Sequence, residues 1–519
     1  MKPKKILGWS SALALSVGAL AAQETTTVEQ LQRQLKQATE TFNKAMEEQR
    51  KLIEELTRKL QALDQSKIAS NSFAATVTTN AGQQARGPAS RQDNDKPWSP
   101  ADPLRLGRGS AYADLGFVGS FVVGGSSADD IEGELEPGGH DPNQRGFTVQ
   151  GMEMNVTGAI DPYFRGQANL LFSVDAEGES FFELEEAWME TTGLPWNLQL
   201  RGGQMFSDFG RHNPTHVHSW SFVDTPLANA RFLGPDGLRN PGARLAWLAP
   251  TPFYSELSFG IQDSHGETAA SFRSEGGHHG EEDEQEAPFA YRHADNDRGI
   301  EHLNDLLFLP RVVVSFDLTP SQVLLFGGSA ALGPNSRGGE SAGDTSTQIY
   351  GVDLTWKWKS PRHQAGFPFV MWQSEAMLRK YDAGAFDWND EGTAADPNIL
   401  LEAGAPAVLP GETLTDYGFY TQLLYGFRKG WVVGTRFDFV TSNEAAYERL
   451  DLTFNGEPLG RDPMRAQRWR LSPNLTWYPT EFSKIRLQYN YDDRLGIGRD
   501  HSVWLQFEFL LGAHAAHKF

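Results

Sequence analysis

The feature that most restricts the fold is an apolar–polar alternation with a period of two, which runs from about Tyr112 to the C-terminus. In one segment the apolar positions are Ile485, Leu487, Tyr489 and Tyr491, and the polar positions are Arg486, Gln488, Asn490 and Asp492. This is the period of a β-strand, whose side chains point to opposite faces in turn. A soluble sandwich would not usually keep large apolar residues on one face and charged residues on the other over so many segments. The pattern therefore predicts an all-β transmembrane barrel.

Sixteen segments carry this alternation, and the connections between them alternate in length. The segments are 112–124, 145–160, 163–175, 181–192, 196–206, 240–249, 252–263, 306–317, 320–332, 345–359, 365–380, 414–427, 430–441, 465–478, 482–493 and 499–511. Several short connections contain proline, among them Pro162, Pro250, Pro320, Pro361 and Pro479. The long connections are 125–144, 207–239, 264–305, 333–344, 381–413 and 442–464. An even number of strands with short turns at one end predicts an antiparallel barrel in a Gram-negative outer membrane, with these turns in the periplasm.

The barrel is predicted to comprise residues 105–519, and the residues before it predict three further segments. Residues 1–22 combine three lysines, a short apolar stretch and an Ala-Leu-Ala end, which indicates a cleaved signal peptide; an uncleaved anchor is the alternative. Residues 23–65 predict a periplasmic coiled coil, because apolar residues recur at a spacing of seven: Val28, Leu35, Phe42, Leu56 and Leu63. This helix would oligomerise, or else lie singly on the barrel rim. Residues 66–104, rich in polar residues, Gly and Pro, predict a flexible linker.

The composition narrows the range of functions. The 519-residue chain has no cysteine, which excludes thiol catalysis, disulfide bonds and zinc bound by cysteine. With 46 Lys+Arg against 67 Asp+Glu, its formal net charge is −21, which argues against nucleic acid as a partner. The sequence shows no nucleophile motif, so we expect no enzymatic activity, and no pattern indicates a cofactor.

The chain resembles Gram-negative outer-membrane porins in its sixteen segments, its long third external loop at 207–239 and its C-terminal Phe519. The coiled coil and linker resemble those of porins with periplasmic extensions, which include phosphate-selective O/P-type porins and sugar and dicarboxylate porins. The resemblance implies a homotrimer, joined through coiled coil and barrel, in contact with outer-membrane lipid. It also implies that Phe519 belongs to a signal for the barrel-assembly machinery. The expected function is diffusion of small hydrophilic solutes, including ions.

In the porins that the chain resembles, the third external loop folds into the lumen and narrows it. Phe209, Trp220, Phe222 and Phe232 could pack such a loop against the wall. The predicted pore constriction consists of the charged residues Asp208, Arg211, Asp224, Arg231, Asp236 and Arg239. Charges of opposite sign facing one another would set up a transverse field that selects small polar solutes. The alternative is that these ions pair only to fasten the loop.

Strand alternation also predicts which charged residues face the lumen. The basic row consists of Arg165, Arg201, Arg244, Lys357, Arg379, Arg436, Arg468, Arg470 and Arg486. The inward acids are Glu183, Glu185, Asp353, Glu375, Asp438, Asp492 and Glu508. This small excess of basic residues predicts a weak preference for anionic or polar solutes. These residues could instead pair across strands and only stiffen the wall.

Histidines in two loops suggest another function. Loop 207–239 carries His212, His216 and His218, and loop 264–305 carries His278 and His279 beside a run of acidic residues. Imidazole suits Zn, Cu or Ni, so these residues are candidate metal ligands, and the protein could bind or take up a divalent metal. Histidines that are hydrogen-bonded or face solvent are the simpler interpretation. A third possibility is structural, with the coiled coil tethering the outer membrane to the cell wall or to a periplasmic partner.

Overall fold

The computed structural model describes residues 104–512, apart from 109–110, 132, 134–136, 175–177, 274–287, 294–299, 338–344, 390–398, 402–403 and 455. The barrel belongs to the second of two compact units, Lys96–Phe519. The predicted signal peptide, coiled coil and most of the linker lie outside the described residues, as do His278, His279 and Phe519. Within the described part of the chain, no helix is long and apolar enough to cross a membrane.

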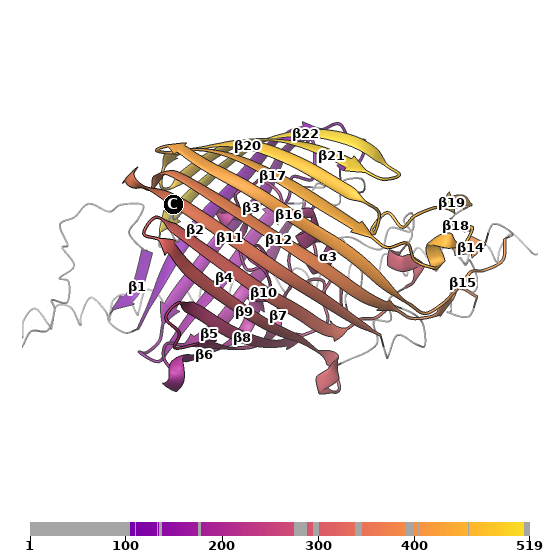
Figure 1. Cartoon of the computed structure of the whole chain (residues 1–519), viewed down its shortest axis with the longest axis horizontal. Helices are drawn as coiled ribbons and strands as arrows, with labels where there is room; N and C mark the ends of the chain where they lie inside the picture. Colours follow the sequence, from indigo (N-terminus) through magenta and orange to yellow (C-terminus); the bar gives the residue numbers. More distant parts are fainter. Residues whose placement is uncertain are drawn as a thin grey trace, which may run out of the picture. The chain divides into compact units, whose positions relative to one another are not determined.

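The described residues form a closed antiparallel β-barrel (Figure 1). Its sixteen strands are β2 (Ala111–Ser126), β3 (Gly146–Ala159), β4 (Phe164–Val174), β5 (Ser180–Thr191), β6 (Leu198–Phe206), β7 (Arg239–Leu248), β8 (Tyr254–Asp263), β9 (Leu306–Thr319), β10 (Gln322–Pro334), β11 (Ser346–Gln364), β12 (Phe367–Ala383), β16 (Glu412–Arg428), β17 (Trp431–Ser442), β20 (Arg468–Thr480), β21 (Ser483–Arg494) and β22 (Gly498–Gly512). Each pairs with the ring strands next to it in the chain, and β2 pairs with β22 to close the ring. The short strand β1 (Leu104–Arg108) also pairs with β2 but is not one of the sixteen strands of the ring. The predicted sixteen-stranded antiparallel barrel is confirmed.

Burial alternates along the strands as the sequence pattern predicts. On β20, Leu471 and Leu475 face outward with 41% and 39% of their surface exposed. The residues between and beside them, Arg470, Ser472 and Asn474, face inward and are buried. The outside of the ring is therefore apolar and the inside is polar.

The short turns and the long loops lie at opposite ends of the barrel, as predicted. One predicted turn is wrong, because the chain does not turn at Pro361. β11 continues to Gln364 and β12 begins at Phe367, so the turn is 365–366, where both residues have positive φ (51° and 91°). The continuous pairing of these two strands ends at Lys359, which is where the alternation in the sequence also ends.

Three long loops pack together at the end of the barrel that carries the long loops, in an assembly that we call the cap. The cap contains β13 (Phe386–Asp387), β14 (Ile399–Leu401), β15 (Val408–Leu409), β18 (Leu452–Phe454), β19 (Glu457–Leu459) and the 3-10 helices η3 (Phe289–Tyr291) and η6 (Tyr447–Arg449). Another 3-10 helix, η4 (Leu303–Asp305), directly precedes β9. The core of the cap includes Tyr291, Trp388 and Tyr447, each with at most 1% of its surface exposed. The indole Nε1 of Trp388 donates a hydrogen bond to the carbonyl of Tyr291 (3.1 Å). The sequence did not predict this core.

The third external connection, residues 207–238, is named the lumen loop here. It contains the 3-10 helix η2 (Val217–Ser219) and the α-helix α3 (Leu227–Leu233). Another 3-10 helix, η1 (Pro195–Asn197), lies outside this loop, in the short turn between β5 and β6. As predicted, Phe209, Trp220, Phe222 and Phe232 are buried. The ring of Phe209 fits against Gly351 of β11, where an added Cβ would lie 2.7 Å from it. The lumen loop and the inner face of β9–β12 thus form an apolar core inside the barrel.

Candidate functional site

The lumen loop lies inside the ring, because it binds the wall on several sides. Its backbone amides donate hydrogen bonds as follows: Val223 to Gln488 on β21, Leu227 to Asp438 on β17, and His212 to Glu375 on β12 (2.8, 3.2 and 2.7 Å). Its side chains also reach β3, β5 and β7. Since these strands are distributed around the ring, only a segment within the ring can contact all of them.

Asp224, one of the predicted constriction residues, binds the wall through its carboxylate. The side chain is 4% exposed and forms ion pairs with Arg436 of β17 (2.7 Å) and Arg470 of β20 (3.0 Å). Gln488 and Asn490 of β21 donate hydrogen bonds to the same carboxylate (2.9 and 2.7 Å). All four partners belong to the wall, so Asp224 fastens the loop, as in the alternative that the sequence left open.

The first long loop, residues 127–145, also binds the lumen loop near Asp224. The carboxylate of Asp141 accepts hydrogen bonds from the amides of Thr225 (2.8 Å) and Gly138 (2.9 Å). Burial, and then the neighbouring Asp224 carboxylate, raise the pKa of Asp141 to about 7. Below that pH, protonation of Asp141 removes its repulsion with Asp224, so the contact between the two loops strengthens as the pH falls.

The other five constriction residues have different surroundings. Asp208 forms ion pairs with Arg244 of β7 (2.8 Å) and Arg311 of β9 (3.6 Å). The remaining four are placed as follows: Arg211 is exposed, Arg231 donates to the carbonyl of Ala466 (2.7 Å), Asp236 lies 4.0 Å from His140, and Arg239 pairs with Glu183. Asp208, Asp224 and Arg239 therefore pair directly with wall residues of opposite charge.

The predicted basic row divides into a buried and an accessible part. Five members have at most 4% of their surface exposed: Arg379, Arg436, Arg468, Arg470 and Arg486. The side chains of Arg165 and Arg201 are 57% and 24% exposed, and both bind the buried carboxylate of Glu190. Arg244 and Lys357 are partly exposed. The more accessible arginines thus lie on the wall formed by β4, β6 and β7.

Sequence reasoning missed several acidic lumen residues, two of them, Glu186 and Glu190, because β5 departs from strict alternation. A β-bulge next to Asn169 places both Glu185 and Glu186 on the inner face, with 2% and 7% exposure. Beyond the bulge the alternation is shifted by one residue, which brings Glu190 into the lumen as well. Glu153 of β3 also faces inward. These acids balance basic residues that the sequence counted as an excess, and the adjacent pair Glu185-Glu186 is the one sequence signal of the bulge.

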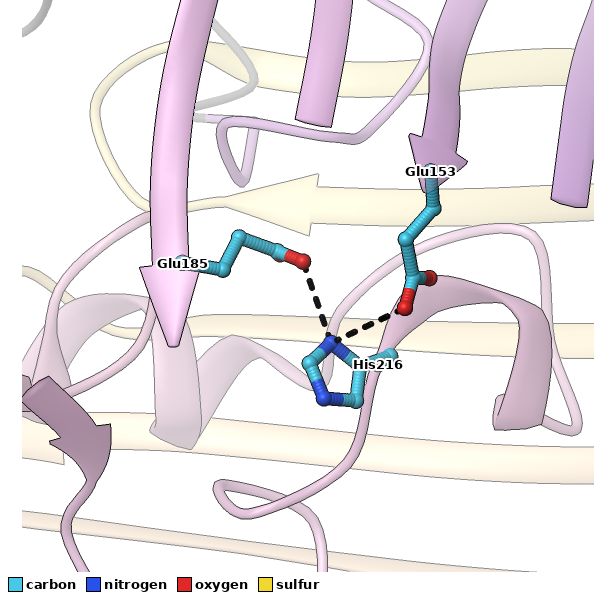
Figure 2. A group of neighbouring side chains, drawn as sticks. All are labelled: Glu153, Glu185 and His216. Carbon is cyan, nitrogen blue, oxygen red and sulfur yellow. Dashed lines mark hydrogen bonds and ion pairs between the residues drawn. The ribbon is translucent and has the colours of Figure 1, made fainter. Parts of the chain in front are cut away.

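The imidazole of His216 lies among carboxylates of the inner wall (Figure 2). Its Nδ1 is 3.1 Å from Glu185 Oε2 and 3.8 Å from Glu153 Oε1. Its Nε2 is 3.0 Å from Glu186 Oε2 and 2.6 Å from the side-chain amide nitrogen of Asn169. The lumen loop supplies the imidazole, and β3, β4 and β5 supply its partners.

Two more histidines border this group. His218 Nδ1 is 2.9 Å from Glu153 Oε2, and its ring stacks on that of His216 with 5.8 Å between centroids. His140, from the first long loop, is 5% exposed, and neither ring nitrogen has a hydrogen-bond partner among the described residues. Its Nε2 lies 3.6 Å from Glu185 Oε1. We call His140, Glu153, Glu185 and His216 the histidine–glutamate cluster.

His212, the third candidate ligand predicted in the lumen loop, lies in a different environment. Its ring packs against Trp220, with 5.0 Å between centroids, and meets the ring of Tyr420 edge-on at 6.4 Å. The structure therefore brings His216 and His218 together at the carboxylates and places His212 among aromatic rings.

Comparisons with known proteins found solved outer-membrane proteins and a relative in sequence. No protein-family model matches the sequence. The outer membrane channel DcaP of Acinetobacter baumannii gives a TM-score of 0.47 at 11% identity, covering 77% of this chain and 97% of the DcaP chain. The anion-selective porin from Comamonas acidovorans gives a TM-score of 0.45 at 8% identity, covering 77% of this chain and 100% of the other. Because both scores are below 0.5, the barrel is assigned from the strand pairings of this chain alone.

An uncharacterized protein of Aquifex aeolicus (strain VF5) is similar in sequence. The two chains are 30% identical over 406 residues, which cover 74% of this chain and 73% of the relative. The match thus extends over most of both proteins, and the chain belongs to the same family as this Aquifex protein.

Proposed function

We propose that the protein is an outer-membrane porin, through which small hydrophilic solutes diffuse along a passage narrowed by the lumen loop. The observation that carries this proposal is the closed sixteen-stranded ring with an apolar outside and a charged inside. A ring without a free edge pairs the backbone groups of its strands with one another, as a lipid environment requires. The contacts of the lumen loop with strands around the ring support the proposed narrowing.

The outer face supports a membrane location. Large apolar side chains are exposed on strands all round the ring, with 43% to 49% exposure for Leu184 on β5, Phe259 on β8, Leu423 on β16 and Leu487 on β21. Soluble proteins rarely expose a continuous apolar surface of this extent, whereas lipid would cover it. The predicted signal peptide, periplasmic coiled coil and homotrimer belong to the same proposal.

The accessible wall supports a preference for anions. Arg165 and Arg201 share one carboxylate, that of Glu190, so this site has one positive charge in excess. The Glu190 side chain is completely buried, whereas both guanidinium groups are partly exposed. Guanidinium groups suit carboxylate and phosphate, so an anion that passes this wall meets the arginines first.

Single-channel recording in planar bilayers tests this function. We expect discrete conductance steps, and in a KCl gradient a reversal potential that shows a preference for Cl⁻. Replacing Arg165 by Ala, which leaves Glu190 paired with Arg201, should shift the permeability ratio toward cations by about fivefold, because one unit charge at about 4 Å in water contributes about 1 kcal/mol. Arg499→Ala is the control, since this exposed arginine pairs with Asp493 near the long loops and should leave the ratio unchanged.

The two parts of the proposal fail separately in this experiment. Protein that migrates as a folded, heat-modifiable barrel but gives no conductance steps would contradict the channel. Cation selectivity of the wild-type channel would contradict the anion preference and leave the channel in place.

A further inference from the structure

We infer that the histidine–glutamate cluster binds one divalent metal ion, which joins the lumen loop and the first long loop to the barrel wall. The ligands are His216 from the lumen loop, His140 from the first long loop, Glu153 from β3 and Glu185 from β5. Charge, distance and the orientation of two histidines support this site. Metal binding does not depend on the proposed channel function, and it can be measured without conductance.

Three buried carboxylates lie close together around His216. Glu153, Glu185 and Glu186 are 5%, 2% and 7% exposed and lie around the imidazole of His216, and Glu153 also contacts His218. Arg239 places a guanidinium group 4.0 Å from Glu185, but that group already pairs with Glu183. Buried carboxylates are ordinarily paired or bound to metal ions, because an isolated buried charge is very unfavourable. A divalent cation would neutralise two of the three.

The distances suit a metal ion with short bonds. Ligand atoms of Glu153, Glu185 and His216 all lie within 4.8 Å of one another. Tetrahedral Zn²⁺, with bonds of about 2.0–2.1 Å, holds its ligand atoms about 3.3 Å apart. The separations of the two carboxylates from His216 Nδ1, 3.1 and 3.8 Å, lie on either side of this value. Small side-chain movements would therefore bring all three atoms to bonding distance of one centre.

His140 supplies an independent indication of a ligand. Its side chain is more than nine-tenths buried, and neither ring nitrogen has a hydrogen-bond partner among the described residues. Buried polar groups usually have such a partner. The Nε2 atom points to the cluster, at 3.6 Å from Glu185 and 4.0 Å from Asp236. A metal ion in the cluster would bind this nitrogen and complete a set of four ligands.

His216 is oriented as metal-bound histidines usually are. Its Nδ1 faces Glu153 and Glu185, and its Nε2 faces Glu186 on the opposite side of the ring. Metal-bound histidines commonly donate their second N–H to a carboxylate, which fixes the ring. The bulge in β5 makes this possible, because it turns two adjacent glutamates inward. One of them serves as a ligand and the other orients the imidazole.

A protonated His216 is the competing explanation. An imidazolium would bridge Glu185 and Glu186 without a metal ion. Together with His218, which lies 2.9 Å from Glu153, it would add at most two positive charges to three carboxylates. It would also leave both ring nitrogens of His140 without a hydrogen-bond partner among the described residues. The mixture of nitrogen and oxygen donors favours Zn²⁺ over Ca²⁺ and Mg²⁺, which prefer oxygen ligands. Zn²⁺ is therefore the appropriate probe.

Equilibrium dialysis of the chelator-treated full-length protein against Zn²⁺, with zinc measured by mass spectrometry, tests the site. The reference protein carries His278→Ala and His279→Ala, because these histidines lie beside acidic residues and could bind zinc themselves. We expect one zinc ion per chain in the reference and none in His216→Ala. Glu186→Gln should keep the site but weaken its affinity about 10- to 100-fold, the usual effect of removing the partner that orients a ligand.

His302→Ala is the matched control, since its imidazole is 73% exposed in the loop before β9, and it should bind zinc as the reference does. Equal zinc content in folded His216→Ala and His302→Ala, or a reference that binds no zinc, would overturn the inference. If His216→Ala does not fold, zinc X-ray absorption of the reference decides instead. One or two imidazole nitrogens together with oxygen ligands support the site, and a zinc environment without imidazole overturns it.

Discussion

At the scale of single residues, buried ions determine where the lumen loop is attached. The Asp224 carboxylate has two wall arginines as partners, and each arginine keeps a further acid, Asp438 for Arg436 and Asp492 for Arg470. Ions of this kind are stable in the interior only while their partners remain in place. Loss of Asp224 therefore weakens the attachment of the loop, while the remaining pairs stay within the wall.

Asp224→Ala should release the lumen loop. Two arginines lose a shared partner, and the side-chain amides of Gln488 and Asn490 lose their acceptor. We therefore expect the free energy that holds the loop on the wall to fall by about 3 kcal/mol. This corresponds to about 100-fold faster cleavage of residues 207–238 by subtilisin. The control is Asp493→Ala, which removes an exposed pair with Arg499. Exposed pairs contribute little to stability, so cleavage should change little. Similar cleavage of both variants would show that Asp224 does not hold the loop.

The sequence predicted part of this detail. Strand alternation placed the arginines of the basic row on the inner face, and the group of histidines in loop 207–239 identified His216 and His218 as candidate ligands. It did not identify His140 or Glu153 as their neighbours, because contacts between a loop and a distant strand depend on how the loop folds. It also missed Glu186, because a bulge changes the direction of every side chain beyond it.

At the scale of elements, the hairpin of β11 and β12 shows how a turn ends a strand pair. β11 is 19 residues long, and residues 360–363 interrupt its ladder before the turn. Ala365 and Gly366 both have positive φ, as in the two-residue turns that match the twist of antiparallel strands. Glycine adopts this conformation freely, whereas alanine does so at a cost, so position 365 is a strained point.

Ala365→Asn should stabilise the barrel by up to about 1 kcal/mol, because asparagine tolerates the left-handed conformation better than alanine. Ala365→Val should destabilise it, because a β-branched side chain is poorly suited to positive φ. Urea unfolding of protein refolded into lipid vesicles, followed by tryptophan fluorescence, gives both values. A change of the same sign in the two variants would contradict this explanation of the turn.

The elements themselves were largely predictable, since sixteen long periodic segments each carry a strong local signal. The cap and α3 were not predicted. Their short strands and single helical turns have no period of their own, and they are stabilised by packing between segments far apart in the sequence, such as Tyr291 with Tyr447 (5.1 Å between ring centroids). The predicted turn at Pro361 was wrong because a proline can also lie in an unpaired part of a strand.

At the scale of the whole molecule, the barrel separates an apolar outer surface from a polar interior. The outward-facing ion pair of Asp493 and Arg499 lies at the ends of β21 and β22, beside the long loops. A charge placed midway along the outer face would meet lipid if the protein spans a membrane. The consequence depends on depth, because a charge near either membrane surface can reach water. Position along a strand therefore predicts the effect of a substitution on stability.

Leu423→Arg, in the middle part of β16, should destabilise the barrel in vesicles by about 2–4 kcal/mol. Leu318→Arg, beside the short turn after β9, should cost about 0–1 kcal/mol, although Leu318 is similarly exposed (51% against 45%). Unfolding in urea measures both. Equal costs would contradict the proposed depth of β16 in the membrane.

The contacts of the lumen loop also impose an order on assembly. Some of its partners, such as Glu153, lie on the second strand of the ring, and others, such as Gln488, lie on the strand before the last. The loop is made long before β21 and β22, yet it cannot complete its contacts until the C-terminal hairpin joins the ring. A barrel that stops short of this step keeps unpaired arginines on its inner face and a loose loop at residues 207–238. Such unfinished molecules differ from finished ones at residues 207–238, so the attachment of this loop also reports that the ring is complete.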